Sequence, residues 1–190
     1  MRKRHSVRDL APTPVPGAVI AACVAAAATA PGGANRQPWH FVAISDPGVK
    51  AQVRAAAEPE ERAFYDGGGG EEWLKSLQPI GTGAEKPHLD RAPWLIAVFA
   101  RRMGTTHDGQ RTKNYHVPES VGIATGLLIA ALHHAGLVVL TQTPNPMRFL
   151  TDLCARPDSD KPAMIIAVGH PAHGATVPAA AKLKSRCHRF

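Results

Sequence analysis

Four short apolar runs along the chain have the length and composition of β-strands. Each is rich in branched or aromatic apolar residues and is bordered by residues such as proline, glycine or aspartate, which interrupt strands. The runs cover residues 39–44 (WHFVAI), 94–100 (WLIAVFA), 137–141 (LVVLT) and 163–168 (AMIIAV). We therefore predict four strands at these positions.

Small and apolar residues at helical spacing predict helices between the strands. The predicted helices cover residues 16–30, 47–57, 118–135 and 147–155, and residues 58–86 are expected to be helical only in parts around their glycines. Asp46 supplies a capping side chain for the second helix, and Gly136 ends the third. The alternation of helices and strands indicates a layered α/β or α+β fold without fixing the strand order.

The composition is that of one globular domain. A chain of 190 residues is long enough for a sizeable core, and 44% hydrophobic with 19% charged residues excludes a disordered protein. The net charge of +7 keeps nucleic acid, phosphate-bearing cofactors and anionic substrates open as ligands. Aromatic residues make up only 5%, without basic residues interleaved, which speaks against a base-stacking surface.

The cysteines favour a reducing compartment. Cys23, Cys154 and Cys187 are widely spaced and form no CxxC motif, so we expect neither a redox pair nor a zinc ribbon, and we expect the protein to be cytoplasmic. The apolar run at residues 18–30 is too short to span a bilayer. We interpret it as a buried helix rather than a secretory signal, and we expect no membrane association.

The most informative polar pattern is Glu61, Tyr65 and, after a glycine-rich stretch, Lys86. Four residues on a helix put Glu61 and Tyr65 on one face. The carboxylate can take the ammonium of a free amino acid, and Lys86 with the Tyr65 hydroxyl can take its carboxylate. The glycines at residues 67–70 are loose enough for the segment to close over a ligand. Taken alone, a solvated helix face and a surface lysine explain the same residues.

Three other segments carry candidate chemistry. Arg4, Ser6 and Arg8 alternate on an extended chain and can converge on a phosphate, although a basic tail is the simpler interpretation. The loop at residues 31–39 (PGGANRQPW) lets backbone N–H groups approach a ring or an anion, or is a plain connection. The hydroxyls of residues 141–144 (TQTP) follow a strand, where cofactors often bind, although threonine is also common in strands.

Together and in order, these segments form a recognisable pattern. The matching words include SVR at Ser6, GAN-x-x-PW at Gly33, EER-x-x-Y ending at Tyr65, TQTP at Thr141 and VGHP at Val168. From about residue 4 to residue 184 the chain resembles the iodotyrosine deiodinase subfamily of the nitroreductase-like flavoproteins. The resemblance implies an α+β fold with a central mixed, largely antiparallel sheet flanked by helices, in an intertwined homodimer. Residues 1–190 would form a single domain, with an active-site lid at about 58–90.

The resemblance also implies FMN, bound at the dimer interface, as the cofactor. Thr143, with Thr141, would lie beside the flavin ring and favour one-electron steps. The Ala34 backbone N–H would donate a hydrogen bond to the substrate phenolate, so Thr143 and Ala34 are the implied catalytic groups. The implied substrate-binding residues are Ala34, Glu61, Tyr65 and Lys86. The implied FMN-binding residues are Arg4, His5, Ser6, Arg8, Gly32, Gly33, Thr141, Gln142, Thr143 and Lys182.

Three of these positions depart from the family pattern. His5 and Lys182 stand where the family has arginine, and Gly32 stands where it has serine. Lysine keeps the positive charge but loses the planar fork of arginine, and histidine makes the charge depend on pH. We expect these changes to affect FMN affinity rather than the identity of the cofactor.

The implied activity is the reductive dehalogenation of a halogenated tyrosine or a related halophenol, with NAD(P)H or a reductase partner as the electron source. Two alternatives remain open at this point. One is a general NAD(P)H-dependent nitroreductase or quinone reductase, which has no need of the lid residues. The other is a basic binding protein without catalysis, although we expect no nucleic-acid partner. The histidines lack acidic partners at ligand spacing, so we expect no metal site.

Overall fold

The computed structural model describes residues 1, 3–105 and 108–178. Its centre is a four-stranded sheet in the order β1 (Trp39–Ile44), β2 (Trp94–Arg101), β6 (Asp160–Gly169) and β5 (Val138–Gln142). Each neighbouring pair of strands is antiparallel. All four predicted strands are confirmed to within three residues at each end, and the layered α+β expectation is confirmed.

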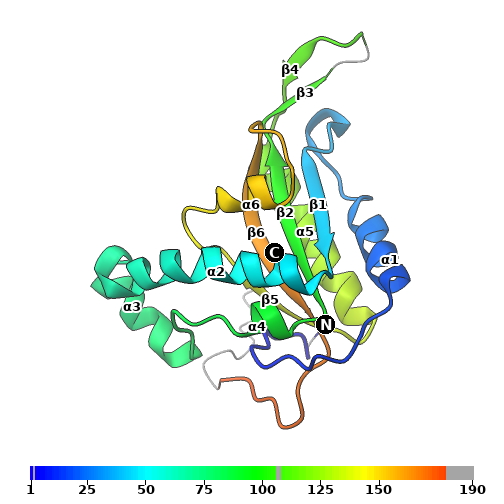
Figure 1. Ribbon diagram of the computed structural model, residues 1–190. Coiled ribbons are helices and arrows are strands. Elements are labelled where there is room, and N and C mark those ends of the chain that lie inside the picture. The colour runs from blue at the N-terminus through cyan, green and yellow to red at the C-terminus, as the bar shows by residue number, and fades with distance from the viewer. Residues whose placement is uncertain (2, 106–107, 179–190) are drawn as a thin grey trace, which may run out of the picture.

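Helices cover both faces of the sheet (Figure 1). One face packs against α1 (Gly17–Ala27) and α5 (Val117–His134), and the other against α2 (Pro47–Ala63), α4 (His88–Arg91) and α6 (Phe149–Leu153). Because side chains alternate along a strand, Ile96 and Val98 enter the first core, whereas Leu95, Ala97 and Phe99 enter the second. The central strand β2 is therefore buried on both sides and provides a rigid frame.

The start of the chain runs along the outer edge of β5. Ser6 forms a parallel bridge with Val139, and the Val7 N–H donates to the Val139 carbonyl at 3.2 Å. This parallel contact gives the otherwise antiparallel sheet its mixed character, as expected. It also brings Ser6 and Arg8, whose side chains alternate with the buried Val7, alongside Thr141.

The helix bounds differ from those predicted at several ends. α1 ends at Ala27 instead of residue 30. Just beyond this end, the Thr29 hydroxyl donates to the Ala26 carbonyl at 2.8 Å. α2 is capped by Asp46 as predicted but continues past residue 57 to Ala63, through Pro59, so the proline does not end it. α6 is shorter than predicted and covers only residues 149–153, instead of 147–155.

Beyond α2 the lid segment is helical in pieces, as expected. It consists of a π-helical turn (Phe64–Gly68), α3 (Glu71–Leu77) and a 3₁₀ turn (Gln78–Ile80). Lys50 and Arg54 on α2 join this helix to α4. The Lys50 ammonium donates to the carbonyl of Ala92 at 2.7 Å, and Arg54 donates to Asp90, so α2 and α4 are held next to each other.

A two-stranded hairpin was not predicted from the sequence. β3 (Met103–Thr105) and β4 (Arg111–Lys113) pair with each other and stand away from the body at the end of β2 (Figure 1). Their residues are largely exposed, so no apolar alternation marks them. The Asn114 side chain donates to the Arg101 carbonyl at 2.8 Å and fixes the base of the hairpin.

The outer face of α5 is apolar and uncovered. We expected this helix to be buried over most of its circumference, but within one chain only the side facing the sheet and α1 is buried. Ile123 and Leu127 are 46% and 38% exposed, next to Gly122 and Gly126, which have open space above them. Neither α5 nor any other helix in the described ranges meets the length and apolarity that a membrane crossing requires.

Candidate active site

The three predicted lid residues lie together. The Lys86 ammonium is 3.0 Å from Glu61 Oε2, and the two side chains are only 4% and 12% exposed. The same ammonium is 5.6 Å from the centre of the Tyr65 ring. Glu61 lies on α2 and Tyr65 in the turn that follows it, as their four-residue spacing predicted. The site therefore contains a buried ion pair bordered by a phenol.

The glycines around Tyr65 are more constrained than we expected. A Cβ on Gly69 would come within 2.5 Å of the Phe64 ring, and Gly67 and Gly70 have φ angles of 127° and 73°. The chain packs Phe64 against Tyr65 and Trp73 through this turn, with ring centres 5.4 and 6.1 Å apart. The glycines therefore allow the chain to form a defined turn here, besides the freedom of movement that we expected of them.

Two residues that the sequence analysis missed, Glu58 and Arg54, help to hold Lys86 in place. The Lys86 N–H donates to Glu58 Oε1 at 2.9 Å, and the Arg54 Nε donates to the same oxygen at 2.7 Å. Burial raises the pKa of the Glu58 carboxyl, but these two hydrogen bonds, together with the charges of Arg54 and Arg62, outweigh it, and the pKa is lowered overall. The i,i+4 spacing of Arg54 and Glu58 was the only sign of the pair in the sequence.

A cavity of about 220 Å³ joins the lid to the start of the chain and to β5. Its lining includes Arg8, Lys86, His88, Thr141 and Gln142. These residues come from segments that are far apart in sequence, and three of the predicted cofactor residues are among them. Two basic residues, Arg8 and Lys86, therefore line one cavity together with the exposed Glu85, and they suit an anionic ligand.

His88 is a third residue that the sequence analysis missed, and a lone histidine gave no signal. It is 6% exposed, and neither its Nε2 nor Oε1 of Gln142 has a hydrogen-bond partner among the described residues. Burial lowers the pKa of His88; the Gln142 amide opposes this shift, and the charges of Lys86 and Arg8 add to it. A neutral imidazole beside an amide oxygen offers a polar edge to a ligand in the cavity.

The predicted loop before β1 is strained. Ala34, Asn35 and Gln37 have φ angles of 50°, 52° and 47°, a region that residues with a side chain rarely adopt. A Cβ on Gly33 would lie 2.8 Å from the Tyr115 carbonyl oxygen, so only glycine fits there. A strained loop of this kind is typical of a ligand contact.

This loop does not meet the cavity within one chain. It enters the sheet at Trp39, whereas Thr141 on β5 lies level with Ala43, and β5 is the last of the four strands counted from β1. Strand spacing puts Trp39, where this loop joins β1, about 20 Å from Thr141. In Figure 1 the start of β1 is at the upper end of the sheet, and α4 is at the lower end. The predicted residues therefore form two groups.

The remaining predicted residues lie near the cavity, in the strained loop or outside the described part of the chain. Arg4, His5 and Ser6 are half-buried in the segment that precedes Arg8, and Thr143 is exposed just beyond the end of β5. Gly32 belongs to the strained loop, where a Cβ would lie 3.3 Å from Trp39 and 3.4 Å from the Ser120 hydroxyl. Lys182 lies outside the described residues.

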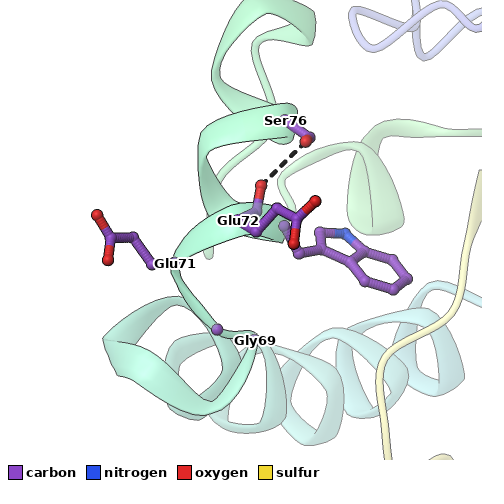
Figure 2. Close-up of a pocket in the computed structure, with 6 residues that line it drawn as sticks. Gly69, Glu71, Glu72 and Ser76 are labelled. Atoms are coloured by element: carbon purple, nitrogen blue, oxygen red, sulfur yellow. Dashed lines mark hydrogen bonds between the residues drawn. The ribbon is translucent and has the colours of Figure 1, made fainter.

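A larger hollow of about 510 Å³ lies at the start of α3, on the outer side of the lid (Figure 2). Glu71 and Glu72 border it, and the Ser76 hydroxyl donates to the Glu72 carbonyl at 2.9 Å. No basic side chain lines this hollow. Among the described residues we also find no cluster of three or more potential metal ligands. The enclosed cavity is therefore the better candidate for chemistry.

Comparison with known proteins identifies the family. A sequence model of the Nitroreductase family matches residues 1–170. The iodotyrosine deiodinase of Haliscomenobacter hydrossis is 50% identical over 178 residues, which cover 94% of this chain and 80% of that protein. The iodotyrosine deiodinase of Nematostella vectensis is 41% identical, with 94% and 68% covered. Human iodotyrosine deiodinase 1 is also 41% identical, and the match covers 94% of this chain and 62% of that protein.

Solved structures agree with the sequence relatives. A crystal structure of oxidized iodotyrosine deiodinase, bound to FMN and 3-iodo-L-tyrosine, matches with a TM-score of 0.82 at 28% identity, covering 99% of this chain and 96% of that one. An FMN-dependent nitroreductase from Clostridium difficile shares the fold, with a TM-score of 0.68 at 18% identity and coverage of 100% and 97%. The chain therefore belongs to the nitroreductase family and, within it, to the iodotyrosine deiodinase subfamily.

Proposed function

We propose that this protein is an FMN-dependent reductive dehalogenase that acts on a halogenated tyrosine of the iodotyrosine type or on a related halophenol. The observation that carries the proposal is the buried Glu61–Lys86 ion pair, whose lysine lines the cavity. A free amino acid brings one ammonium and one carboxylate, so its zwitterion offers each member of the pair a new partner. A nitroaromatic or a quinone offers neither charge.

The residues present fit FMN as the cofactor, which supplies the electrons for breaking the carbon–halogen bond. Arg8 directs a guanidinium at the cavity, and the buried, unpartnered atoms of His88 and Gln142 offer a polar edge for a flavin ring. We assign Arg4 and Ser6, with Arg8, to the phosphate. His5 stays a proposed contact of the same segment, and NAD(P)H or a reductase partner is the proposed electron source.

In this proposal the lid residues bind the substrate by exchanging partners. The Glu61 carboxylate leaves Lys86 and accepts hydrogen bonds from the substrate ammonium. Lys86, with the Tyr65 hydroxyl that now donates to Thr82 at 3.2 Å, then donates to the substrate carboxylate. Because two charges replace two charges, the exchange leaves no buried charge unpaired. The closed lid also keeps water from the reacting ring.

Ala34 and Thr143 are the groups that we assign to the reacting part of the substrate and cofactor. The Ala34 N–H would donate to the phenolate oxygen and stabilise its negative charge. Thr143 lies two residues beyond Thr141, which lines the cavity, so its hydroxyl is a candidate donor to the flavin ring. Gly32 and Gly33 let the backbone of the Ala34 loop approach a ligand closely.

A homodimer completes the proposed site. The Ala34 loop joins β1 at Trp39, about 20 Å from Thr141 in the cavity of the same chain, so the loop of one copy would complete the cavity of the other. The outer apolar face of α5, with Ile123 and Leu127, supports such an interface. The projecting β3–β4 hairpin can contact the second copy as well. We also propose a reducing, cytoplasmic location, supported by the free thiols of Cys23 and Cys154.

The activity itself is tested anaerobically. Purified protein reconstituted with FMN is reduced with dithionite and mixed with 3-iodotyrosine, and free iodide is measured beside the flavin spectrum. We expect iodide release in about a 1:1 ratio with flavin reoxidation. Flavin that stays reduced with 3-iodotyrosine but is reoxidised by a nitroaromatic would support the general nitroreductase instead. Protein that cannot bind FMN would contradict both enzymes and favour a non-catalytic binding protein.

The lid assignment predicts a substrate-dependent defect. For Glu61→Gln and Lys86→Gln we expect the KM for 3-iodotyrosine to rise about 10- to 100-fold, because a charge-assisted hydrogen bond is lost. The KM for 2-iodophenol, which lacks the amino-acid end, should stay within about threefold. Glu72→Gln, an exposed carboxylate on the same lid, is the matched control. Equal losses on both substrates would remove the zwitterion-binding role.

The dimer predicts that charge on the outer face of α5 is disruptive. The double variant Ile123→Glu with Leu127→Glu should sediment as a monomer and lose about tenfold or more in FMN affinity, because burying unpaired charge is unfavourable. Gln52→Glu, which adds a charge on the exposed side of α2, should remain a dimer with unchanged FMN binding. A monomeric variant that still binds FMN tightly would contradict a site shared between copies.

A further inference from the structure

Lys86 is attached to α2 at two points. Its backbone N–H donates to Glu58 Oε1 at 2.9 Å, and its ammonium lies 3.0 Å from Glu61 Oε2. Glu58 and Glu61 are three residues apart and so lie on the same side of the helix. The chain before Lys86 contains Gly81, with a φ angle of 63°, and Gly83, where a Cβ would meet open space. α2 therefore provides two of the contacts that hold Lys86 in place.

Arg54 fixes the other side of the same arrangement. Its Nε donates to Glu58 Oε1 at 2.7 Å, and its Nη1 donates to Asp90 Oδ2 on α4, four residues after Lys86. One guanidinium thus joins the carboxylate that receives the Lys86 amide to the short helix that follows Lys86. Planar, charged donors of this kind hold geometry better than a single flexible ammonium does.

A second arginine near Glu58, Arg62, makes weaker contacts than Arg54 does. Arg62 lies 3.9 Å from Glu58 and 3.3 Å from Glu85, and its side chain is 49% exposed, as against 13% for Glu58. Exposed pairs at such distances contribute little, whereas a carboxylate that is largely withdrawn from water and accepts two hydrogen bonds is firmly held. Arg62 is therefore the natural control for Arg54.

We propose that Arg54 and Glu58 are positioning residues of the lid, which hold Lys86 beside Glu61 before the substrate arrives. The inference rests on the proposed function, because it concerns how the zwitterion of the substrate is bound. A preformed ion pair spares the substrate the cost of ordering Lys86, so the device acts on the affinity for the amino-acid end. It does not act on the reacting ring, which Arg54 and Glu58 do not touch.

The test compares Glu58→Ala with Glu58→Gln in the FMN-loaded, full-length protein. Glu58→Ala removes the acceptor of the Lys86 N–H, and we expect its KM for 3-iodotyrosine to rise about tenfold with kcat within about twofold. Glu58→Gln keeps an acceptor oxygen and should show a smaller rise. The KM for 2-iodophenol should change in neither. Hydrogen exchange of the Lys86 amide gives a direct readout, with protection lost in Glu58→Ala and largely kept in Glu58→Gln.

Arg54 and two control arginines complete the series. Arg54→Gln should resemble Glu58→Ala in its selective effect, and Arg62→Gln should leave both KM values unchanged. Arg156→Gln removes a similar i,i+4 pair, with buried Asp160 at 2.7 Å, at the start of β6, and should lower the Tm without changing the ratio of the two KM values. Equal effects on both substrates, or no effect of Glu58→Ala on KM and amide exchange, would overturn the positioning role.

The same series separates this inference from the proposed function. If Glu61→Gln discriminates between the two substrates while Glu58→Ala and Arg54→Gln do not, Lys86 is held in place without them, and only the positioning role fails. If Glu61→Gln itself does not discriminate, the zwitterion is not bound by the lid, and the substrate-binding part of the proposed function fails together with the positioning role, whereas iodide release still tests the activity itself. Each variant is first checked for FMN absorbance and for a cooperative unfolding transition, so that an unfolded protein is not mistaken for a substrate effect.

Discussion

The candidate site depends on one buried ion pair, Glu61 with Lys86. Withdrawing two charges from water is costly, and the attraction between them repays that cost only while they remain together. Removing either partner leaves a charge unpaired, so the pair separates readily only for a ligand that replaces both partners at once. This constraint turns an ordinary interaction into a selective one: the site favours a zwitterion over a molecule with one charge or none.

The rest of the fold holds the elements of this site in fixed positions. The central strand β2 is buried on both faces, and α2 and α4 pack on one side of it, joined through Lys50 and Arg54. The start of the chain pairs along β5 and brings Arg8 to the cavity. The proposed lid, with α3 and two short helical turns, lies between the end of α2 and Lys86, and both of these ends are held by contacts with α2 or α4. The strained Ala34 loop lies at the other end of the sheet and is proposed to serve a second copy.

The sequence predicted what depends on local spacing. The strands follow apolar runs because both cores need branched side chains, and Glu61 and Tyr65 both approach Lys86 because they are one helical turn apart. The closeness of Lys86 was a hypothesis from the charges and from the family resemblance, since no local spacing links it to Tyr65, 21 residues earlier. The sequence did not reveal Arg54 and Glu58 as positioning residues, because their partners Lys86 and Asp90 come from another segment. A single histidine such as His88 forms no sequence pattern. The separation of the Ala34 loop from the cavity could not be predicted either, because it depends on the order of the strands in the sheet. The β3–β4 hairpin lacks the apolar alternation that marks a buried strand.

The most direct measurement of the central claim is calorimetric titration of the FMN-loaded protein with three matched ligands: 3-iodo-L-tyrosine, 3-iodotyramine and 3-(4-hydroxy-3-iodophenyl)propionate. The last two lack the carboxylate and the ammonium, respectively. If the zwitterion replaces both partners of the Glu61–Lys86 pair, each truncated ligand should bind about 10- to 100-fold more weakly, because one buried charge is left unpaired. Equal affinity for all three ligands would contradict the account, since the ion pair would then take no part in recognising the substrate.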